Sequence, residues 1–220
     1  MMNRRHFLGT LLGTTMVSWS GLSAEAAELN KDYVVLDKPL PNANGTVIKV
    51  YSYDCPFCFR YDTGVDPTLV PKLEALGLKF VPQHLETKGK YGRTASEFFA
   101  LCQLKDEEAH RNLEDPASLF KKAKDAVYLA YHRKSERWTG GEPAFIATLS
   151  TATGISAEAF AKERQRADVQ ALVESWKPVY AVAKVQGIPA YVVNGKYLLL
   201  TRSITSIDSM VATIKELAAK

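Results

Sequence analysis

The segment Cys55-Pro56-Phe57-Cys58 constrains this chain more than any other feature, because of where it lies. The β-branched and aromatic run Thr46–Tyr53 precedes it and predicts a strand, and the residues after it predict a helix. A thiol at a helix N-terminus meets unpaired backbone N–H groups and the positive end of the helix dipole, which both favour the thiolate. Cys55 is therefore predicted to ionise well below the pKa of about 8.5 of a free cysteine, and far below pH 7. Cys58 follows on the same helix face and is predicted to be more buried.

A cysteine pair can also form an inert structural disulfide or one half of a metal site. A closed zinc site needs about four ligands, but the sequence has no second Cys-x-x-Cys, and His84, His110 and His132 are scattered along it. These observations favour a redox-active pair and no metal. The third cysteine, Cys102, ends the apolar run Phe98–Cys102 and is expected to be a buried, unreactive thiol.

The N-terminus is typical of an export signal. Arg4-Arg5 precedes the apolar stretch Phe7–Leu22, and Ala24-Glu25-Ala26 has the form of a cleavage site, so residues 1–26 are predicted to be a cleaved signal peptide. A membrane anchor is the alternative, although the stretch is short and weak for a span of about 20 residues. Arg4-Arg5-His6-Phe7-Leu8 matches the twin-arginine pattern R-R-x-F-L, but it also fits a general secretory signal, and both routes stay open. Either route leads to an oxidising compartment, where disulfides persist.

The mature sequence alternates in character along its length. Strand patterns are predicted at both ends, over residues 33–36, 46–53, 78–81, 190–193 and 196–200, with Asn194-Gly195 as a hairpin turn. Between them, apolar residues recur at helical spacing over 95–104, 119–131, 144–149, 157–164 and 169–184. Neither the N-terminal nor the C-terminal segment can bury a sheet alone, so we expect residues 27–92 and 185–220 to form one discontinuous α/β domain. Residues 93–184 are expected to form a helical domain inserted between these two segments.

Four separated motifs in this order resemble one family. They are Ser52–Cys58, His84–Gly89, Ala130–His132 and Gln186–Tyr191, and the last contains Gly187-Ile188-Pro189 at the start of a strand. Together they resemble the DsbA family of thiol:disulfide oxidoreductases, and they are most similar to its DsbL branch, over essentially the whole mature chain. The resemblance implies a thioredoxin fold with an inserted all-helical domain.

The resemblance also implies a function. It predicts a periplasmic dithiol oxidase that introduces disulfide bonds into exported proteins through the Cys55-Cys58 disulfide, with no other cofactor. The expected partners are exported client proteins, among them an arylsulfate sulfotransferase as a preferred client, and a membrane quinone-linked reoxidase of the DsbB/DsbI type. A monomer is expected, and the mildly basic net charge of +4 gives no indication of a nucleic-acid partner. The alternatives are a disulfide isomerase or reductase and, outside enzymes, a thiolate metal carrier.

Further site residues follow from the resemblance. Pro189 is expected to be cis, with its loop beside the cysteines and free to pair with an extended client; the alternative is an ordinary proline at a strand start. Ile188, Pro56 and Phe57 are expected to contact the client. Phe57 stands where many DsbA proteins have histidine, so the thiolate must be stabilised by the helix terminus and by other cations.

Lys49 is one candidate for such a cation. It lies six residues before Cys55, where DsbA-type sequences typically have a buried acid. A buried lysine there would favour a thiolate, whereas the alternative is a lysine that extends to solvent.

Two basic clusters have two interpretations. Lys88, Lys90 and Arg93 form one, and the other consists of Lys121, Lys122, Lys124, Arg133, Lys134 and Arg137. They are either solvated faces or a basic surface around the cysteines that selects acidic clients.

Overall fold

The computed structural model describes residues 26–220, and the predicted signal peptide lies outside this range except for Ala26. A single five-stranded sheet has the order β1-β5-β4-β2-β3. Its strands are β1 (Tyr33–Val35), β2 (Thr46–Tyr51), β3 (Lys79–His84), β4 (Ala190–Val193) and β5 (Tyr197–Leu199). β2 pairs with β3 in parallel and with β4 antiparallel. Strands from the two ends of the chain therefore share one sheet, as the sequence pattern predicted.

Nine α-helices lie within the described residues: α1 (Pro56–Gly64), α2 (Asp66–Ala75), α3 (Gly92–Glu108), α4 (Leu119–His132), α5 (Glu142–Thr153), α6 (Ala157–Glu163), α7 (Ala167–Ser175), α8 (Val179–Gln186) and α9 (Ile207–Ala218). The prediction of one continuous helical run over 169–184 is wrong, because the helix is interrupted between the end of α7 at Ser175 and the start of α8 at Val179. Pro178 lies at this break, where a proline ring clashes with the preceding helical turn and supplies no N–H. The strand predicted over 46–53 ends two residues earlier, at Tyr51.

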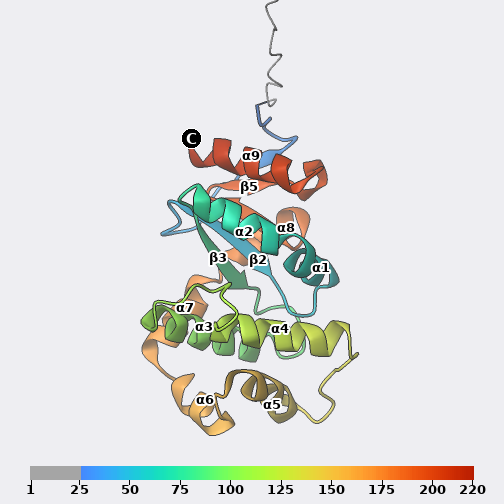
Figure 1. The fold of residues 1–220 in the computed structure, drawn as a ribbon, viewed down its shortest axis with the longest axis vertical. Helices are drawn as coiled ribbons and strands as arrows, with labels where there is room; N and C mark the ends of the chain where they lie inside the picture. Colours follow the sequence, from blue (N-terminus) through green and yellow to red (C-terminus); the bar gives the residue numbers. More distant parts are fainter. Residues whose placement is uncertain (1–25) are drawn as a thin grey trace, which may run out of the picture.

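Helices cover both faces of the sheet (Figure 1). Alternation along β2 sends Val47 into a core with α2 and α9, and sends Ile48 into a second core with α8. The first core contains Leu69 and Leu73 of α2 and Ile214 of α9, all buried. β2 thus lies in the centre of the sheet with apolar packing on both sides, which fixes the position of the residues that follow it.

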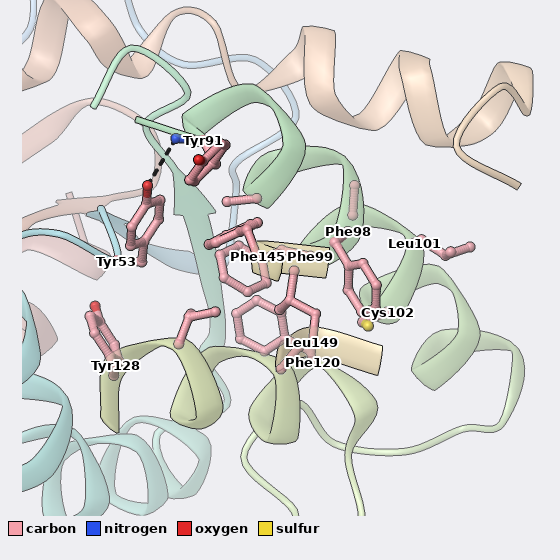
Figure 2. Close-up of a cluster of buried hydrophobic side chains, with 14 of the residues drawn as sticks. Tyr53, Tyr91, Phe98, Phe99, Leu101, Cys102, Phe120, Tyr128, Phe145 and Leu149 are labelled. Atoms are coloured by element: carbon pink, nitrogen blue, oxygen red, sulfur yellow. Dashed lines mark hydrogen bonds between the residues drawn. The ribbon is translucent and has the colours of Figure 1, made fainter. Parts of the chain in front are cut away.

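The helices α3 to α7 form a separate tier below the sheet, with α5 and α6 furthest from it (Figure 1). Their core is rich in aromatic side chains and reaches the end of β2. Figure 2 shows part of this cluster, in which Phe99, Phe120 and Leu149 lie close together and Cys102 is enclosed. The ring centroids of Phe99 and Phe120 are 5.8 Å apart in an edge-to-face arrangement.

The architecture is a thioredoxin fold with a helical insertion, which is the predicted fold class. The division of the chain at residues 92 and 184 stays a prediction; α8 crosses the second of these positions and packs against the sheet. No single helix of residues 26–220 has the length and apolar character to cross a membrane, and α5 and α6 pass such a test only together, across a bend of 100°.

Candidate active site

The two cysteines lie at the junction between the central strand and the first helix. β2 ends at Tyr51, a turn follows, and α1 begins at Pro56 with Cys55 as its N-cap. The extended backbone of Cys55 (φ −84°, ψ 115°) turns its sulfur back over the helix end, where it accepts a hydrogen bond from the backbone N–H of Cys58 at 3.2 Å. The thiol therefore occupies the position that an Asp or Ser side chain takes at an ordinary N-cap. Pro56 fits the first helical position, where its missing N–H costs no hydrogen bond.

This geometry separates the acidities of the two thiols. The Cys58 thiol donates to the Cys55 sulfur and, together with the backbone N–H groups of Cys58 and Phe57, lowers the pKa of Cys55 to about 7, although burial opposes the shift. Burial and the neighbouring Cys55 sulfur raise the pKa of Cys58, against smaller opposite effects of Lys49 and the Ser52 N–H. Cys55 is 7 % exposed and Cys58 is fully buried. Cys55 is thus the more exposed and the more acidic of the two sulfurs, as the sequence predicted, although its pKa of about 7 is higher than the expected ionisation far below pH 7.

A loop from the C-terminal part of the chain closes over Cys55. The Ile188–Pro189 peptide bond is cis, as expected from the resemblance. The Cys55 thiol lies 3.5 Å from the carbonyl oxygen of Ile188, to which it donates when protonated. An open cleft of about 590 Å³ runs between this loop and α1, and its lining includes Pro56, Phe57 and Ile188. The structure therefore brings Pro56, Phe57 and Ile188 together around Cys55, whereas Pro189 follows Ile188 in the chain and does not line the cleft.

Phe57 is exposed, with 55 % of its surface accessible. The guanidinium of Arg60 lies over its ring, 4.4 Å from the centroid. Such an exposed aromatic ring next to a reactive sulfur offers apolar surface to a partner, and the stacked cation adds positive charge beside it.

Lys49 is buried, which excludes the interpretation that it extends to solvent; only 2 % of its surface is accessible. Its ammonium is bonded to Asp66 and lies 3.5 Å from a carboxylate oxygen of Asp62. Burial alone would lower the pKa of Lys49, but the charges of Asp66 and Asp62 outweigh it and raise that pKa, so the side chain is charged. The charge of Lys49 lowers the pKa of Cys58. Two carboxylates therefore offset much of the positive charge that the sequence placed near the cysteines.

The ion cluster around Lys49 extends towards the surface. Lys124 of α4 is also buried, and its Nζ donates to Asp62 at 2.6 Å and to Glu114 at 3.3 Å. Tyr191 of β4 donates to the other oxygen of Asp66 at 2.7 Å. Sequence reasoning missed these contacts, because the partners come from α1, α2, α4, β4 and the loop before α4, and no local pattern pairs them.

The basic clusters divide between the two interpretations. Lys88 lines the cleft beside Cys55, as does Lys184. Arg93 instead forms ion pairs with Glu86, Glu97 and Glu174 away from the cysteines. The buried ammonium of Lys124 belongs to the cluster below Cys58. Of the residues in the two clusters, only Lys88 therefore lines the cleft and supports the alternative of a basic surface around the cysteines.

Cys102 lies on α3 and is fully buried in the helical tier (Figure 2). Burial raises its pKa well above the ordinary value, so its thiol is protonated and inert. Within residues 26–220, no group of three or more His, Cys, Asp or Glu side chains is arranged to hold a metal ion.

Comparisons with known proteins agree with this geometry. No family model matches the chain. It is 50 % identical over 213 residues to the thiol:disulfide interchange protein DsbL of Escherichia coli, covering 96 % of this chain and 95 % of that protein. The crystal structure of DsbL from Salmonella enterica serovar Typhimurium superposes with a TM-score of 0.85 at 51 % identity, covering 89 % of this chain and 98 % of that one. The thiol:disulfide interchange protein DsbA of Dickeya dadantii is 25 % identical over 194 residues, 86 % of each chain.

Proposed function

Because this chain belongs to the DsbL branch of the DsbA family of thiol:disulfide oxidoreductases, we propose that it is a periplasmic dithiol oxidase with a narrow range of exported clients. The observation that carries this proposal is the difference between its two thiols. The pKa of Cys55 is lowered to about 7 and that of Cys58 is raised. A protein that stabilises one of its thiolates stabilises its own reduced form, and its disulfide is correspondingly oxidising.

The proposed reaction transfers two electrons from a client dithiol to the protein. A client thiolate attacks the Cys55 sulfur of the Cys55-Cys58 disulfide, a mixed disulfide forms, and Cys58 leaves as a thiolate that takes up a proton. The second client thiolate then attacks the client sulfur of the mixed disulfide and expels Cys55 as a thiolate. A low pKa makes Cys55 a good leaving group, which drives this second step towards the oxidised client. The buried, high-pKa Cys58 is suited to hold the proton.

The cleft supports a proposal for how clients bind. An extended peptide is proposed to lie along the loop before β4, with its cysteine at Cys55 and apolar side chains against Phe57 and Ile188. Gly187 and Ile188, which precede β4, line the cleft, and we propose that their backbone pairs with the client as in recognition by strand addition. Lys88 and Lys184 add positive charge to the same cleft. We propose that they favour clients with acidic residues near the reactive cysteine.

The remaining parts of the proposal concern location and partners. Residues 1–26 are proposed to direct export, and a membrane quinone-linked protein of the DsbB/DsbI type is proposed to restore the Cys55-Cys58 disulfide after each transfer. An arylsulfate sulfotransferase is proposed as a preferred client, and the working form is proposed to be a monomer. Nothing beyond the disulfide itself is proposed as a cofactor.

A transfer assay tests this function. The oxidised mature protein is mixed with equimolar reduced arylsulfate sulfotransferase or with a reduced, unrelated secreted protein, and disulfides are counted by quenched alkylation and mass spectrometry. We expect rapid transfer to the sulfotransferase and slower transfer to the unrelated protein, with none from the Cys55→Ser variant. Equal rates would refute the narrow client range. Absence of transfer to both proteins would refute the oxidase.

A further inference from the structure

Tyr53, two residues before Cys55, has an unusual pair of backbone partners. It lies between the end of β2 and the start of α1, and its side chain is buried. A buried backbone N–H or C=O outside regular structure needs another partner. The N–H of Tyr53 donates to Nε2 of His84 at 3.3 Å, and Nε2 of His132 bonds to the Tyr53 carbonyl at 2.8 Å. Two imidazoles thus hold one residue from its two sides.

The chemistry of the partners fixes the tautomer of His84. A backbone N–H can only donate, so Nε2 of His84 must be unprotonated, and its proton must be on Nδ1. Nδ1 lies 2.8 Å from the hydroxyl of Ser96, which accepts that proton. Burial lowers the pKa of His84 to about 3, so the imidazole stays neutral and keeps its acceptor. His84 ends β3 and is paired in register with Tyr51.

His132 must adopt the opposite tautomer. A carbonyl oxygen can only accept, so Nε2 of His132 carries the proton and donates it to Tyr53. His132 ends α4, and its ring stacks on Phe59 with the centroids 4.9 Å apart and an angle of 6° between the planes. Phe59 directly follows Cys58. His132 therefore touches the chain on both sides of the cysteine motif.

Further contacts fix the same segment. The ring of Tyr53 stacks on that of His84 at 5.8 Å, and its hydroxyl accepts a hydrogen bond from the backbone N–H of Tyr91 at 2.9 Å (Figure 2). Ser52 lies next to Tyr53, and its carbonyl accepts the backbone N–H of Cys55 at 3.2 Å. The backbone N–H of Ser52 in turn lowers the pKa of Cys58. The position of residues 52 and 53 thus sets the surroundings of both sulfurs.

We propose that His84 and His132 form a histidine clamp on the backbone of Tyr53, and that through this clamp they are positioning residues for the Cys55 thiolate. The proposal rests on the role of Cys55 proposed above. Neither histidine has another role in the proposed reaction. His84 ends a strand of the sheet, and His132 ends a helix of the helical tier. The clamp therefore ties the active-site turn to both halves of the fold. It holds the cysteine sulfur within reach of the N–H groups of Phe57 and Cys58 that stabilise its anion.

The tautomers give a test that does not depend on activity. In the mature protein labelled with ¹⁵N in histidine, long-range correlations from the ring protons distinguish protonated from unprotonated ring nitrogens. We expect His84 to carry its proton on Nδ1 and His132 to carry its proton on Nε2. The same tautomer in both rings would overturn the clamp, whatever the function of Cys55.

Matched substitutions then test the link to the thiolate. His132→Phe keeps a ring that can stack on Phe59 but removes the donor, whereas His132→Gln keeps a side-chain N–H. We expect His132→Phe to raise the pKa of Cys55 by about half a unit, which is about threefold in the dissociation constant, and His132→Gln to restore part of this change. The pKa is read from thiolate absorbance against pH. His110→Phe is the control, because His110 is exposed beyond the end of α3.

Thermal unfolding of each variant separates positioning from a general loss of stability. A His132→Phe variant that loses stability but keeps the wild-type pKa of Cys55 would overturn the proposal, because the histidine would then be only structural. If His132→Phe fails to fold, His132→Leu, which likewise removes the donor to the Tyr53 carbonyl, provides the same measurement, with His132→Gln as the variant that keeps an N–H. An unchanged pKa of Cys55 in His132→Phe, or the same rise in His110→Phe, contradicts the positioning role.

Discussion

Replacing Lys49 with methionine tests the buried ion cluster below Cys58. Methionine has a similar length, so the change removes the charge without opening a large cavity. It leaves the buried carboxylates of Asp66 and Asp62 with Lys124 as their remaining buried cation. Removing one partner of a buried ion pair costs about 3–5 kcal/mol, because the other charge stays buried without compensation. For a chain of this size, that corresponds to a fall of roughly 6–20 °C in Tm.

The loss should also depend on pH. Burial opposes ionisation of Asp62, but Lys124 and then Lys49 outweigh it and hold the pKa of Asp62 below its ordinary value. A carboxyl group with a lowered folded-state pKa stabilises the fold above its unfolded pKa of about 3.9, and this contribution is lost as the pH falls through the folded-state pKa. The variant lacks part of that contribution at neutral pH. The difference between wild type and Lys49→Met should therefore be largest near pH 7 and shrink below about pH 4.

Urea unfolding of the reduced mature protein, followed by circular dichroism at several pH values, measures this difference. Lys72→Met is the matched control, because Lys72 forms an exposed ion pair with Asp208 at 2.9 Å and should cost less than about 1 kcal/mol. The double variant Lys49→Met/Asp66→Asn, which removes the stranded charge as well, should recover about half of the loss or more. A loss below about 1 kcal/mol at pH 7 in Lys49→Met would refute the reasoning, since Lys49 would then behave like a surface lysine.

Three further outcomes are expected. Alkylation of the reduced protein should modify Cys55 with a midpoint near pH 7, while Cys102 stays unmodified until the protein unfolds; mass spectrometry that found Cys102 modified first would contradict the assigned acidities. Asp106→Asn should lower the free energy of unfolding by about 2 kcal/mol, because the buried carboxylate caps the N-terminus of α4 through two backbone N–H groups; a change within about 0.5 kcal/mol in urea unfolding would argue against that cap. The double variant Lys88→Glu/Lys184→Glu should slow disulfide transfer to an acidic cysteine peptide several-fold more than transfer to a neutral one, as measured by stopped flow. An equal effect on the two peptides would contradict selection of clients by charge.

The sequence was most informative where one local signal determines one local structure. Cys55 and Cys58 follow a strand pattern and precede a helix pattern, and the Asn194-Gly195 turn joins two strands, so their surroundings could be predicted without knowledge of distant contacts. The order of strand and helix patterns also led to the correct fold class. The break at Pro178 was missed because the apolar residues keep their helical spacing across it.

The environment of Lys49 shows what local patterns leave undetermined. Alternation along β2 placed it on one face of the strand, but whether its charge was solvated or paired depended on Asp62, Asp66 and Lys124. Asp62 and Lys124 are 62 positions apart, and their contact exists only once α1 and α4 pack together. Contacts of this kind follow from tertiary packing, and the sequence periodicity of a single element contains no information about them.

The reduction potential of the Cys55-Cys58 pair tests the central claim most directly. The purified mature protein is equilibrated with glutathione buffers of graded composition, and the state of both cysteines is read after acid quenching and alkylation. The proposed disulfide-donating function predicts an oxidising potential, far above that of thioredoxin and towards the value of about −120 mV of DsbA. A thioredoxin-like potential near about −270 mV would show that the reduced form is not stabilised and would contradict a disulfide-donating function.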